Sequence, residues 1–229
     1  MAHRKRRGKL SFVSVPLRTV AAAVLAASAA IATPLTLSSA LPRANAVACN
    51  DIEVVFARGT KEDPGIGRVG QAFVNDLRNL VGGRSLGVYA VNYPASYDFL
   101  AAADGANDAS AHIQNVASTC PNTKLVLGGY SQGAAIIDVL AAVPFPVIGF
   151  TNPLPPYVSD RIAALAVFGN PSTRIGIPLT SSPVYGTRSI DLCNPGDPIC
   201  SPGDDVPAHR SYGPDGTARQ AATFVANLL

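Results

Sequence analysis

Two patterns of apolar residues, one typical of strands and one typical of helices, alternate along the chain after residue 47. Short apolar runs of strand length are separated by longer segments whose apolar residues recur at helical spacing. The predicted strands cover residues 52–57, 86–93, 125–129, 162–168 and 188–192. The predicted helices cover residues 69–81, 98–119, 132–143 and 217–229. This alternation predicts an α/β fold in which a parallel sheet carries helices on both faces and binds ligands outside the carboxyl ends of its strands.

Apolar side chains mark the buried faces of two of these helices. In the segment 98–119 the stripe consists of Phe99, Ala102, Ala103, Ala106, Ile113 and Val116. In the last helix the inward residues are Ala218, Ala221, Ala222, Val225 and Leu228. The proline-rich segment 144–157 and the segment 201–214, rich in Pro, Gly and Asp, are predicted loops. Because no repeat or interdomain linker is visible, we expect a single domain.

Residues 1–46 differ in composition from the rest of the chain. They contain seven Lys and Arg residues and no acid, an apolar run at 20–32, and the small residues of Ala44-Asn45-Ala46. This order is typical of a secretory signal peptide. The apolar run is too short to cross a hydrocarbon core of ~30 Å as a helix, although an uncleaved amphipathic anchor is an alternative. We therefore predict a signal peptide at 1–46 and a secreted, extracellular or cell-wall-associated domain at 47–229.

The charge of the predicted domain is opposite to that of the whole chain. The chain has 18 Lys and Arg against 15 Asp and Glu, a net charge of +3. All 15 acids but only 11 of the cations lie after residue 46, so the domain has a net charge of −4. The basic character belongs to the export signal, and we expect no nucleic-acid partner.

Four cysteines in an exported chain favour two disulfides. They are Cys49, Cys120, Cys193 and Cys200. Of the three possible pairings we favour 49–120 and 193–200, the second of which would hold a tight loop in shape. A metal site is disfavoured, because the spacings are not paired CxxC units and only two histidines lie in the domain. We therefore expect no metal and no cofactor.

A serine stands between two glycines where the strand 125–129 meets the helix 132–143. The sequence Gly129-Tyr130-Ser131-Gln132-Gly133 is G-x-S-x-G, a pattern that exposes the serine Oγ on a sharp turn between a strand and a helix. Ser131 is therefore the candidate nucleophile. The alternative is a glycine-rich strand end in which the serine only caps the helix.

A serine nucleophile needs a base, and the base needs a carboxylate that orients it. His209 is the candidate base because it follows Ser131, in the α/β-hydrolase order of Ser, Asp and His. His112 precedes the serine and is expected to be exposed on its helix. Asp197, flanked by two cysteines, is the candidate acid, because a disulfide would hold it in place. Asp191, at the end of a predicted strand, is its main rival.

Acyl transfer also needs hydrogen-bond donors for the developing oxyanion. The geometry of the turn makes the N–H of Gln132 one of them. Thr60, in the turn Arg58-Gly59-Thr60 after the first strand, is the candidate for the second, through its N–H and its hydroxyl. The alternative for this turn is a plain strand end with no catalytic role.

Four motifs occur in order in the domain and are followed by His209. They are Phe56-Ala57-Arg58-Gly59-Thr60, Val91-Asn92-Tyr93-Pro94-Ala95, Gly129-Tyr130-Ser131-Gln132-Gly133 and Cys193-Asn194-Pro195-Gly196-Asp197-Pro198-Ile199-Cys200. Together they resemble the cutinases, and in particular the cutinase-like secreted serine esterases of mycobacteria and related actinobacteria. The likeness extends from Cys49 to the end of the chain.

The resemblance implies an α/β-hydrolase with a central five-stranded parallel sheet, helices on both faces and no lid. It implies Ser131, Asp197 and His209 as the catalytic residues. It places the oxyanion hole at Thr60 and Gln132, and it implies the same two disulfides.

The implied activity is hydrolysis of short- to medium-chain carboxylic esters, with lipid or cutin-type esters among the substrates. We expect a monomer that makes transient contact with a lipid or cell-wall surface. The loop 203–208 before His209 contains two acids where fungal cutinases are strongly apolar, which argues against a waxy polymer. An apolar rim for the acyl chain is expected among residues of the segment 144–157, about half of which should instead pack in the core. These residues are Phe145, Val147, Ile148, Phe150, Leu154 and Tyr157.

Two other functions remain open from the sequence. The same catalytic residues could act on acetylated polysaccharide, as in an acetylxylan-type esterase. Alternatively, the chain could be a non-catalytic surface or antigenic binding protein on a hydrolase scaffold, although every residue type of the triad is present.

Overall fold

The computed structural model describes residues 48–229, and the predicted signal peptide lies outside these residues. The described chain contains one sheet of five parallel strands in the order β2-β1-β3-β4-β5. The strands are β1 (Ile52–Ala57), β2 (Leu86–Ala90), β3 (Lys124–Tyr130), β4 (Ile162–Phe168) and β5 (Ser189–Leu192). Because all strands run in the same direction, their carboxyl ends share one edge of the sheet.

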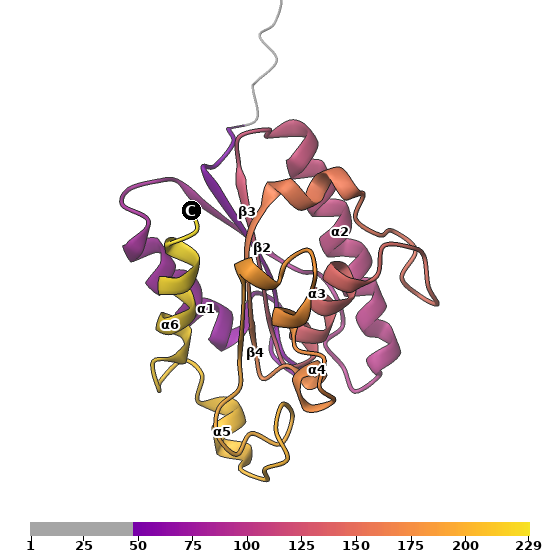
Figure 1. Cartoon of the computed structure of the whole chain (residues 1–229), viewed down its shortest axis with the longest axis vertical. Coiled ribbons are helices and arrows are strands. Elements are labelled where there is room, and N and C mark those ends of the chain that lie inside the picture. Colours follow the sequence, from indigo (N-terminus) through magenta and orange to yellow (C-terminus); the bar gives the residue numbers. More distant parts are fainter. Residues whose placement is uncertain (1–47) are drawn as a thin grey trace, which may run out of the picture. The chain divides into compact units, whose positions relative to one another are not determined.

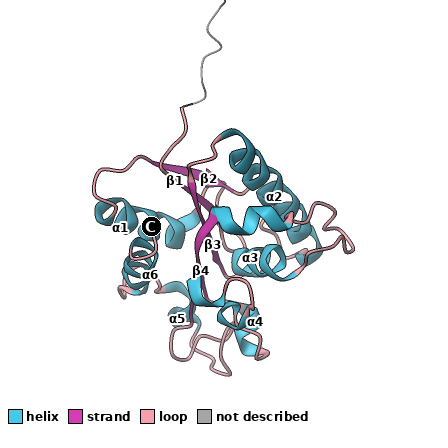
Figure 2. Ribbon diagram, turned by 45° about the horizontal axis from the view of Figure 1, so that its top comes forward, coloured by secondary structure: helices cyan, strands magenta, loops and turns pink. Residues whose placement is uncertain are grey.

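Helices cover both faces of this sheet. The longer helices are α1 (Gly67–Leu80), α2 (Ala102–Thr119), α3 (Gln132–Ala142) and α6 (Thr217–Ala226). The short helices are α4 (Pro171–Arg174) and α5 (Val206–Arg210). Single 3₁₀ segments occupy Phe99–Ala101, Pro156–Arg161, Leu179–Ser181 and Gly186–Arg188. Helices α1 and α6 lie on one face and α2 and α3 on the other (Figures 1 and 2), which confirms the predicted α/β layers.

The central strands bury side chains on both faces, because successive residues of a strand point to opposite sides. Toward α1 and α6, Phe56 of β1 packs with Phe73 and Phe168, and the three ring centroids are 6.0 to 6.5 Å apart. Toward α2 and α3, Leu127 of β3 packs in a second cluster with Ile137. All five side chains are fully buried. The sheet edge that carries the candidate residues is therefore supported from both sides.

Strand β2 is shorter than the sequence predicts. The prediction extended it to residue 93, but it ends at Ala90. Beyond that residue the carbonyls of Val91 and Tyr93 accept hydrogen bonds from the guanidinium of Arg58, at 3.4 and 2.8 Å. The buried Arg58 thus donates to carbonyl groups that would accept hydrogen bonds from a neighbouring strand if β2 were longer.

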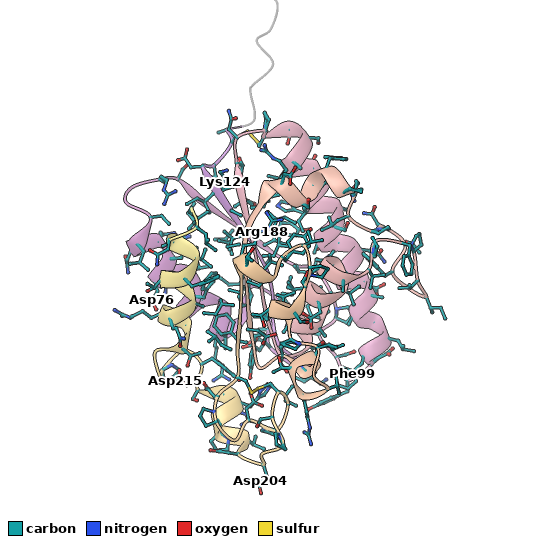
Figure 3. All side chains as sticks on the ribbon, in the orientation of Figure 1. Asp76, Phe99, Lys124, Arg188, Asp204 and Asp215 are labelled. Atoms are coloured by element: carbon teal, nitrogen blue, oxygen red, sulfur yellow. A yellow bond between two sulfur atoms is a disulfide. The ribbon has the colours of Figure 1, made fainter. Side chains whose placement is uncertain are left out.

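The segment 98–119 does not form one continuous helix. The side chain of Asp98 accepts a hydrogen bond from the N–H of Leu100 (3.2 Å) and so caps a separate 3₁₀ turn before α2. This turn directs Phe99 outward, and its side chain is 62% exposed rather than buried as predicted (Figure 3). The last helix ends at Ala226, so Leu228 is exposed instead of facing the core.

Two disulfides hold the ends of elements together. Cys49 and Cys120 join the start of the described chain to the end of α2, with Cα atoms 5.5 Å apart. Cys193 and Cys200, with Cα atoms 5.8 Å apart, close the loop that follows β5. Within residues 48–229 no helix is both long and apolar enough to cross a membrane.

Candidate active site

Ser131 lies at the sharp turn between β3 and α3, at the carboxyl edge of the sheet. Its backbone has φ 55° and ψ −116°, a conformation that residues with a side chain rarely adopt. A Cβ on Gly129 would lie 2.3 Å from the carbonyl O of Gly133, and one on Gly133 would lie 2.0 Å from the carbonyl O of Ala57. The two glycines of G-x-S-x-G are therefore required because backbone passes too close to both positions for any side chain.

Three side chains from separate segments meet beside this turn. The Nε2 atom of His209 lies 3.0 Å from the Oγ of Ser131, and Nδ1 of the same ring lies 2.7 Å from Oδ2 of Asp197. His209 comes from α5, and Asp197 comes from the disulfide-closed loop after β5. Tyr130 supports the imidazole, because its ring lies 5.0 Å away and its hydroxyl donates to the carbonyl of His209 (2.6 Å). The structure thus brings side chains 131, 197 and 209 into one hydrogen-bonded chain.

The carboxylate of Asp197 is fully buried and accepts three hydrogen bonds. Oδ1 accepts from the N–H of Ile199 (2.7 Å), and Oδ2 accepts from His209 and from the hydroxyl of Tyr212 (2.5 Å). Burial disfavours the ionised form, but these hydrogen bonds and the charge of His209 outweigh it and lower the pKa of Asp197 below its ordinary value. Asp197 is therefore ionised at neutral pH and suited to hold an imidazolium.

Tyr212 is a contact of the site that the sequence reasoning missed. Its fully buried ring packs edge-on against Phe168, with centroids 5.9 Å apart. Its hydroxyl accepts from the N–H of Asn194 (3.0 Å) while it donates to Asp197 (2.5 Å). Because the N–H of Asn194 occupies the acceptor side of this hydroxyl, its O–H bond points to Asp197. The only signal in the sequence is its position three residues after His209.

Asp191, the rival acid, is engaged elsewhere. Its carboxylate accepts from Asn170 Nδ2 and from the N–H of Leu179, both at 2.8 Å, and from Thr173 Oγ1 at 3.0 Å. Burial raises the pKa of Asp191. These contacts anchor the segment 170–179 to β5, which is a structural role.

His112 is not the exposed helix residue that the sequence suggested. Its ring stacks on Tyr89 with centroids 3.6 Å apart, and its Nε2 lies 3.1 Å from Oε1 of Glu53. The histidine therefore joins α2 to strands β1 and β2, and it lies outside the chain of contacts that contains Ser131.

His209 lies in a short helix rather than in the predicted loop. The side chain of Asp205 accepts from the N–H of Ala208 (3.2 Å) and caps α5, and Pro207 occupies its first turn. Both residue types favour a helix start, so the signal was present in the sequence. Asp205 is therefore the capping residue of α5.

The two candidate oxyanion residues lie side by side. Thr60 Oγ1 donates to Gln132 Oε1 (3.1 Å), and Gln132 Nε2 donates to the carbonyl of Ser96 (3.1 Å). Gln132 is the first residue of α3, so its N–H has no acceptor within the helix. The turn that carries Thr60 is held by Glu62, whose Oε2 accepts from the N–H of Gly59 (2.7 Å). Thr60 and Gln132 both line the cavity beside Ser131.

A cavity of about 960 Å³ opens beside the nucleophile. Its apolar lining comes from Ile66, Tyr97, Phe99 and Ile199, among others. None of the six residues expected to form an acyl-binding rim lines it, so that expectation was wrong. Phe145, Val147, Ile148 and Tyr157 are exposed away from the cavity, and Phe150 and Leu154 are buried in the core.

The segment 144–157, which was expected to line the cavity, is instead hydrogen-bonded to α2. Asn107 of α2 donates to the carbonyl of Gly149 (2.7 Å) and accepts from the N–H of Thr151 (2.9 Å). The wall expected there is supplied instead by Tyr97 and Phe99. In the described part of the chain, no cluster of three or more His, Cys, Asp or Glu side chains could hold a metal ion.

A parallel five-stranded α/β fold with a serine on a strained strand–helix turn defines an α/β-hydrolase. The Cutinase family model matches residues 48–229, and the chain belongs to the cutinase family. Phospholipase Culp4 of Mycobacterium tuberculosis is 58% identical over 206 residues, 90% of this chain and 90% of the relative. Carboxylesterase Culp1 of Mycobacterium bovis is 50% identical over 210 residues, 87% of this chain and 92% of the relative. The chain is thus a carboxylic ester hydrolase of the mycobacterial cutinase-like group.

Solved structures agree with this placement. Trichoderma reesei cutinase in complex with a C11Y4 phosphonate inhibitor matches with a TM-score of 0.65 and 36% identity, over 79% of this chain and 77% of that chain. The catalytic core domain of acetyl xylan esterase from Trichoderma reesei matches with a TM-score of 0.67 and 27% identity, over 80% of this chain and 100% of that chain.

Proposed function

We propose that the protein is a secreted serine esterase that hydrolyses short- to medium-chain carboxylic esters, lipid esters among them, through an acyl-enzyme on Ser131. The observation that carries this proposal is the continuous contact from Ser131 Oγ through the imidazole of His209 to Asp197, at 3.0 and 2.7 Å. Such a chain lets the imidazole take the serine proton and return it to the leaving group. A serine on a strained turn that is linked through an imidazole to a buried carboxylate favours a catalyst over a non-catalytic binding protein.

In the first half-reaction, His209 Nε2 accepts the proton of Ser131 as the Oγ attacks the ester carbonyl carbon. The N–H of Gln132 donates to the oxyanion of the tetrahedral intermediate, together with the N–H of Thr60 or with its hydroxyl once that leaves Gln132 Oε1. When this intermediate collapses, the bond to the alcohol oxygen breaks and that oxygen takes the proton from His209. Asp197 stays ionised and holds the imidazole in the required tautomer.

In the second half-reaction, water replaces the alcohol. His209 takes a proton from the water as its oxygen attacks the acyl carbon. Collapse of the second tetrahedral intermediate breaks the bond to Ser131, whose Oγ regains a proton from His209. The carboxylic acid is released, and the enzyme returns to its starting state.

Support for the substrate class comes from the apolar lining of the cavity and from the names of the relatives, a carboxylesterase and a phospholipase. The structural match to an acetyl xylan esterase supports a second candidate, deacetylation of polysaccharide. We expect faster release of acid from tributyrin than from acetylxylan. The opposite ranking would favour the polysaccharide esterase.

The direct test of the proposal is hydrolysis of p-nitrophenyl butyrate by the purified, disulfide-bonded protein. Ser131→Ala is expected to lower kcat by about a thousandfold or more, because the nucleophile is lost. Ser118→Ala, at an exposed position near the end of α2, is the matched control and should leave kcat unchanged. Retained activity in Ser131→Ala would reject the assignment.

Export and a monomeric state are also parts of this proposal. The basic head, apolar run and small residues of 1–46 support export, and two disulfides suit an oxidising compartment. The protein recovered from culture medium is expected to begin near residue 47 and to elute as a monomer in size-exclusion chromatography.

A further inference from the structure

The cavity beside Ser131 has two chemically different walls. The segment before α2 contributes the aromatic rings of Tyr97 and Phe99, which are 71% and 62% exposed. Helices α1 and α5 contribute the guanidinium groups of Arg68 and Arg210. Helix α1, which carries Arg68, and helix α2, which follows the aromatic segment, lie on opposite faces of the sheet (Figure 1). An ester consists of an acyl portion and an alcohol portion, and each can contact a different wall of the cavity.

The position of the proposed general acid decides which side of the ester meets which wall. His209 must protonate the leaving oxygen, so the alcohol portion of the substrate has to lie on the imidazole side of Ser131. Arg210 directly follows His209 in α5. Arg68 and Arg210 line the cavity together with His209 and with Tyr130, whose ring packs on this imidazole. The alcohol portion therefore meets Arg68 and Arg210. The acyl chain meets the wall of Tyr97 and Phe99, where Lys61 Nζ lies over the Tyr97 ring, 5.4 Å from its centroid.

Both guanidinium groups are available to a ligand. Arg210 is exposed and has no ion pair with any residue of the described chain. The side chain of Arg68 is 75% exposed and its Nε lies 3.8 Å from Oε1 of Glu62, a long contact. The Glu62 carboxylate already accepts from the N–H of Gly59 (2.7 Å) and from the N–H of Arg68 (2.9 Å). An anion with closer oxygens would compete well for these donors.

The charge of the cavity lining differs from that of the rest of the domain. Three cations, Lys61, Arg68 and Arg210, line it together with two carboxylates, Glu62 and Asp63. Residues 47–229 as a whole carry 15 acids and only 11 cations. A locally positive cavity on an acidic domain attracts anionic substrates to this one place.

We propose that Arg68 and Arg210 form an anion-recognition site for the alcohol portion of the substrate, and that the substrate class is esters whose alcohol bears a phosphate group. The proposal rests on the serine-esterase function and defines its specificity. Guanidinium groups suit phosphate oxygens because their planar N–H donors bind two oxygens at once. The phosphate can belong to a membrane lipid or to a soluble glycerophosphate ester, and the recognition chemistry is the same for both.

The test uses two soluble esters with the same acyl group, 1-butyrylglycerol and 1-butyrylglycerol 3-phosphate. The quantity measured is the ratio of kcat/KM for the phosphate ester to kcat/KM for the neutral ester. At low salt the unmodified enzyme should give a ratio of about ten or more, and 0.5 M NaCl should reduce it. Arg68→Gln and Arg210→Gln should each lower the ratio about fivefold, and the double variant should bring it close to one. Arg219→Gln on α6, whose partner is Asp76, is the matched control and should leave the ratio unchanged.

The outcomes separate this proposal from the one on which it rests. A ratio near one in the unmodified enzyme, or a ratio that persists in the double variant, would overturn the anion site. Failure to hydrolyse either ester would instead reject the serine-esterase proposal. A third arm presents a neutral butyryl ester in vesicles with and without phosphatidylglycerol. An arginine-dependent gain from anionic vesicles alone, with no preference between the soluble esters, would show recognition of a membrane surface and contradict the proposed substrate class.

Discussion

Two aspartates near the end of β5, the fully buried Asp197 and the partly buried Asp191, accept the same number of hydrogen bonds but have pKa values shifted in opposite directions. Asp197 accepts from His209, Tyr212 and the N–H of Ile199. Asp191 accepts from side chains and backbone of the segment 170–179, also three times. In spite of burial the pKa of Asp197 is lowered, whereas burial raises the pKa of Asp191.

The partners explain this difference. Asp197 faces His209, which can carry a positive charge, and all three donors to Asp191 are neutral. Asn170 Nδ2 donates to Asp191 and also lies 3.3 Å from Oδ1 of Asp138, a second carboxylate. The pKa of Asp138 is raised to about 6, because it is buried and because the charge of Asp191 is nearby. The comparison teaches that the count of hydrogen bonds does not decide the ionisation of a carboxylate. What decides it is whether the hydrogen bonds, those of His209 and Tyr212 first, outweigh the cost of burial.

The largest expected effect comes from removing the charge of Asp197. Asp197→Asn should lower kcat for p-nitrophenyl butyrate by about a thousandfold or more, because an amide can hold the imidazole in the wrong tautomer. Asp191→Asn is the matched control. It should lower kcat less than about fivefold but reduce the free energy of unfolding by about 1–3 kcal/mol, because its new NH₂ group faces hydrogen-bond donors. Kinetics and urea denaturation of both variants would show whether the two roles are instead reversed.

An intermediate effect is expected from Tyr212, a positioning residue that acts through Asp197. Tyr212→Phe keeps the ring packing but removes one donor to the carboxylate. We expect kcat to fall about tenfold with KM within about twofold. The acid limb of the kcat/KM profile should move to higher pH by about half a unit, since a carboxylate that has lost a hydrogen bond of ~1 kcal/mol attracts the proton of the imidazolium more strongly. Steady-state kinetics between pH 4 and pH 9 measure both changes.

A second tyrosine offers a matched control for this variant. The hydroxyl of Tyr89 also bonds a carboxylate, that of Asp108 (3.0 Å), but it does so at the β2 edge of the sheet. Tyr89→Phe should leave the pH profile unchanged. If Tyr212→Phe alters only the free energy of unfolding and leaves the acid limb in place, its role is structural and not catalytic positioning.

The smallest effect is on stability and depends on pH. Oδ2 of Asp138 is buried without a hydrogen-bond partner in the described structure, and the raised pKa means that folding favours the protonated form. The stabilising contribution is therefore complete below the ordinary pKa of an aspartate and is lost as the pH rises through about 6. Asp138→Asn should raise the free energy of unfolding by about 1–3 kcal/mol at pH 8 and by less at pH 5. The exposed Asp204 (Figure 3) provides the control Asp204→Asn, and an equal change at both pH values would contradict the coupling.

The fold and the strand–helix turn that carries Ser131 could be predicted because their signals are local. Apolar runs of β1, β3 and β4 match buried strands, and the glycines around Ser131 reflect backbone contacts within one turn. The choice between Asp191 and Asp197 could not be settled in the same way, since both lie close to the end of β5. Only the path of the chain after that strand determines which carboxylate faces His209.

The cavity walls were harder still to predict. Phe99 sits at helical spacing with the core residues of α2, but the cap at Asp98 turns it outward, and no periodic pattern records that change. Tyr212 reaches Asp197 because α5 and the residues after it contact the disulfide-closed loop, where Asn194 bonds the carbonyl of Ala208 and the hydroxyl of Tyr212. Arg68 and Arg210 are 142 positions apart in the chain, so their shared place at one cavity follows from the topology and not from any motif.

The central claim is that Ser131 is activated through His209 by Asp197. It is tested most directly by the rate at which a fluorophosphonate probe labels the protein, with the modified peptide identified by mass spectrometry. The account predicts stoichiometric labelling of Ser131, at least about a hundredfold slower in Asp197→Asn and within about threefold of the parent rate in Asp191→Asn. Labelling at another residue, or equal rates in Asp197→Asn and the parent, would contradict it.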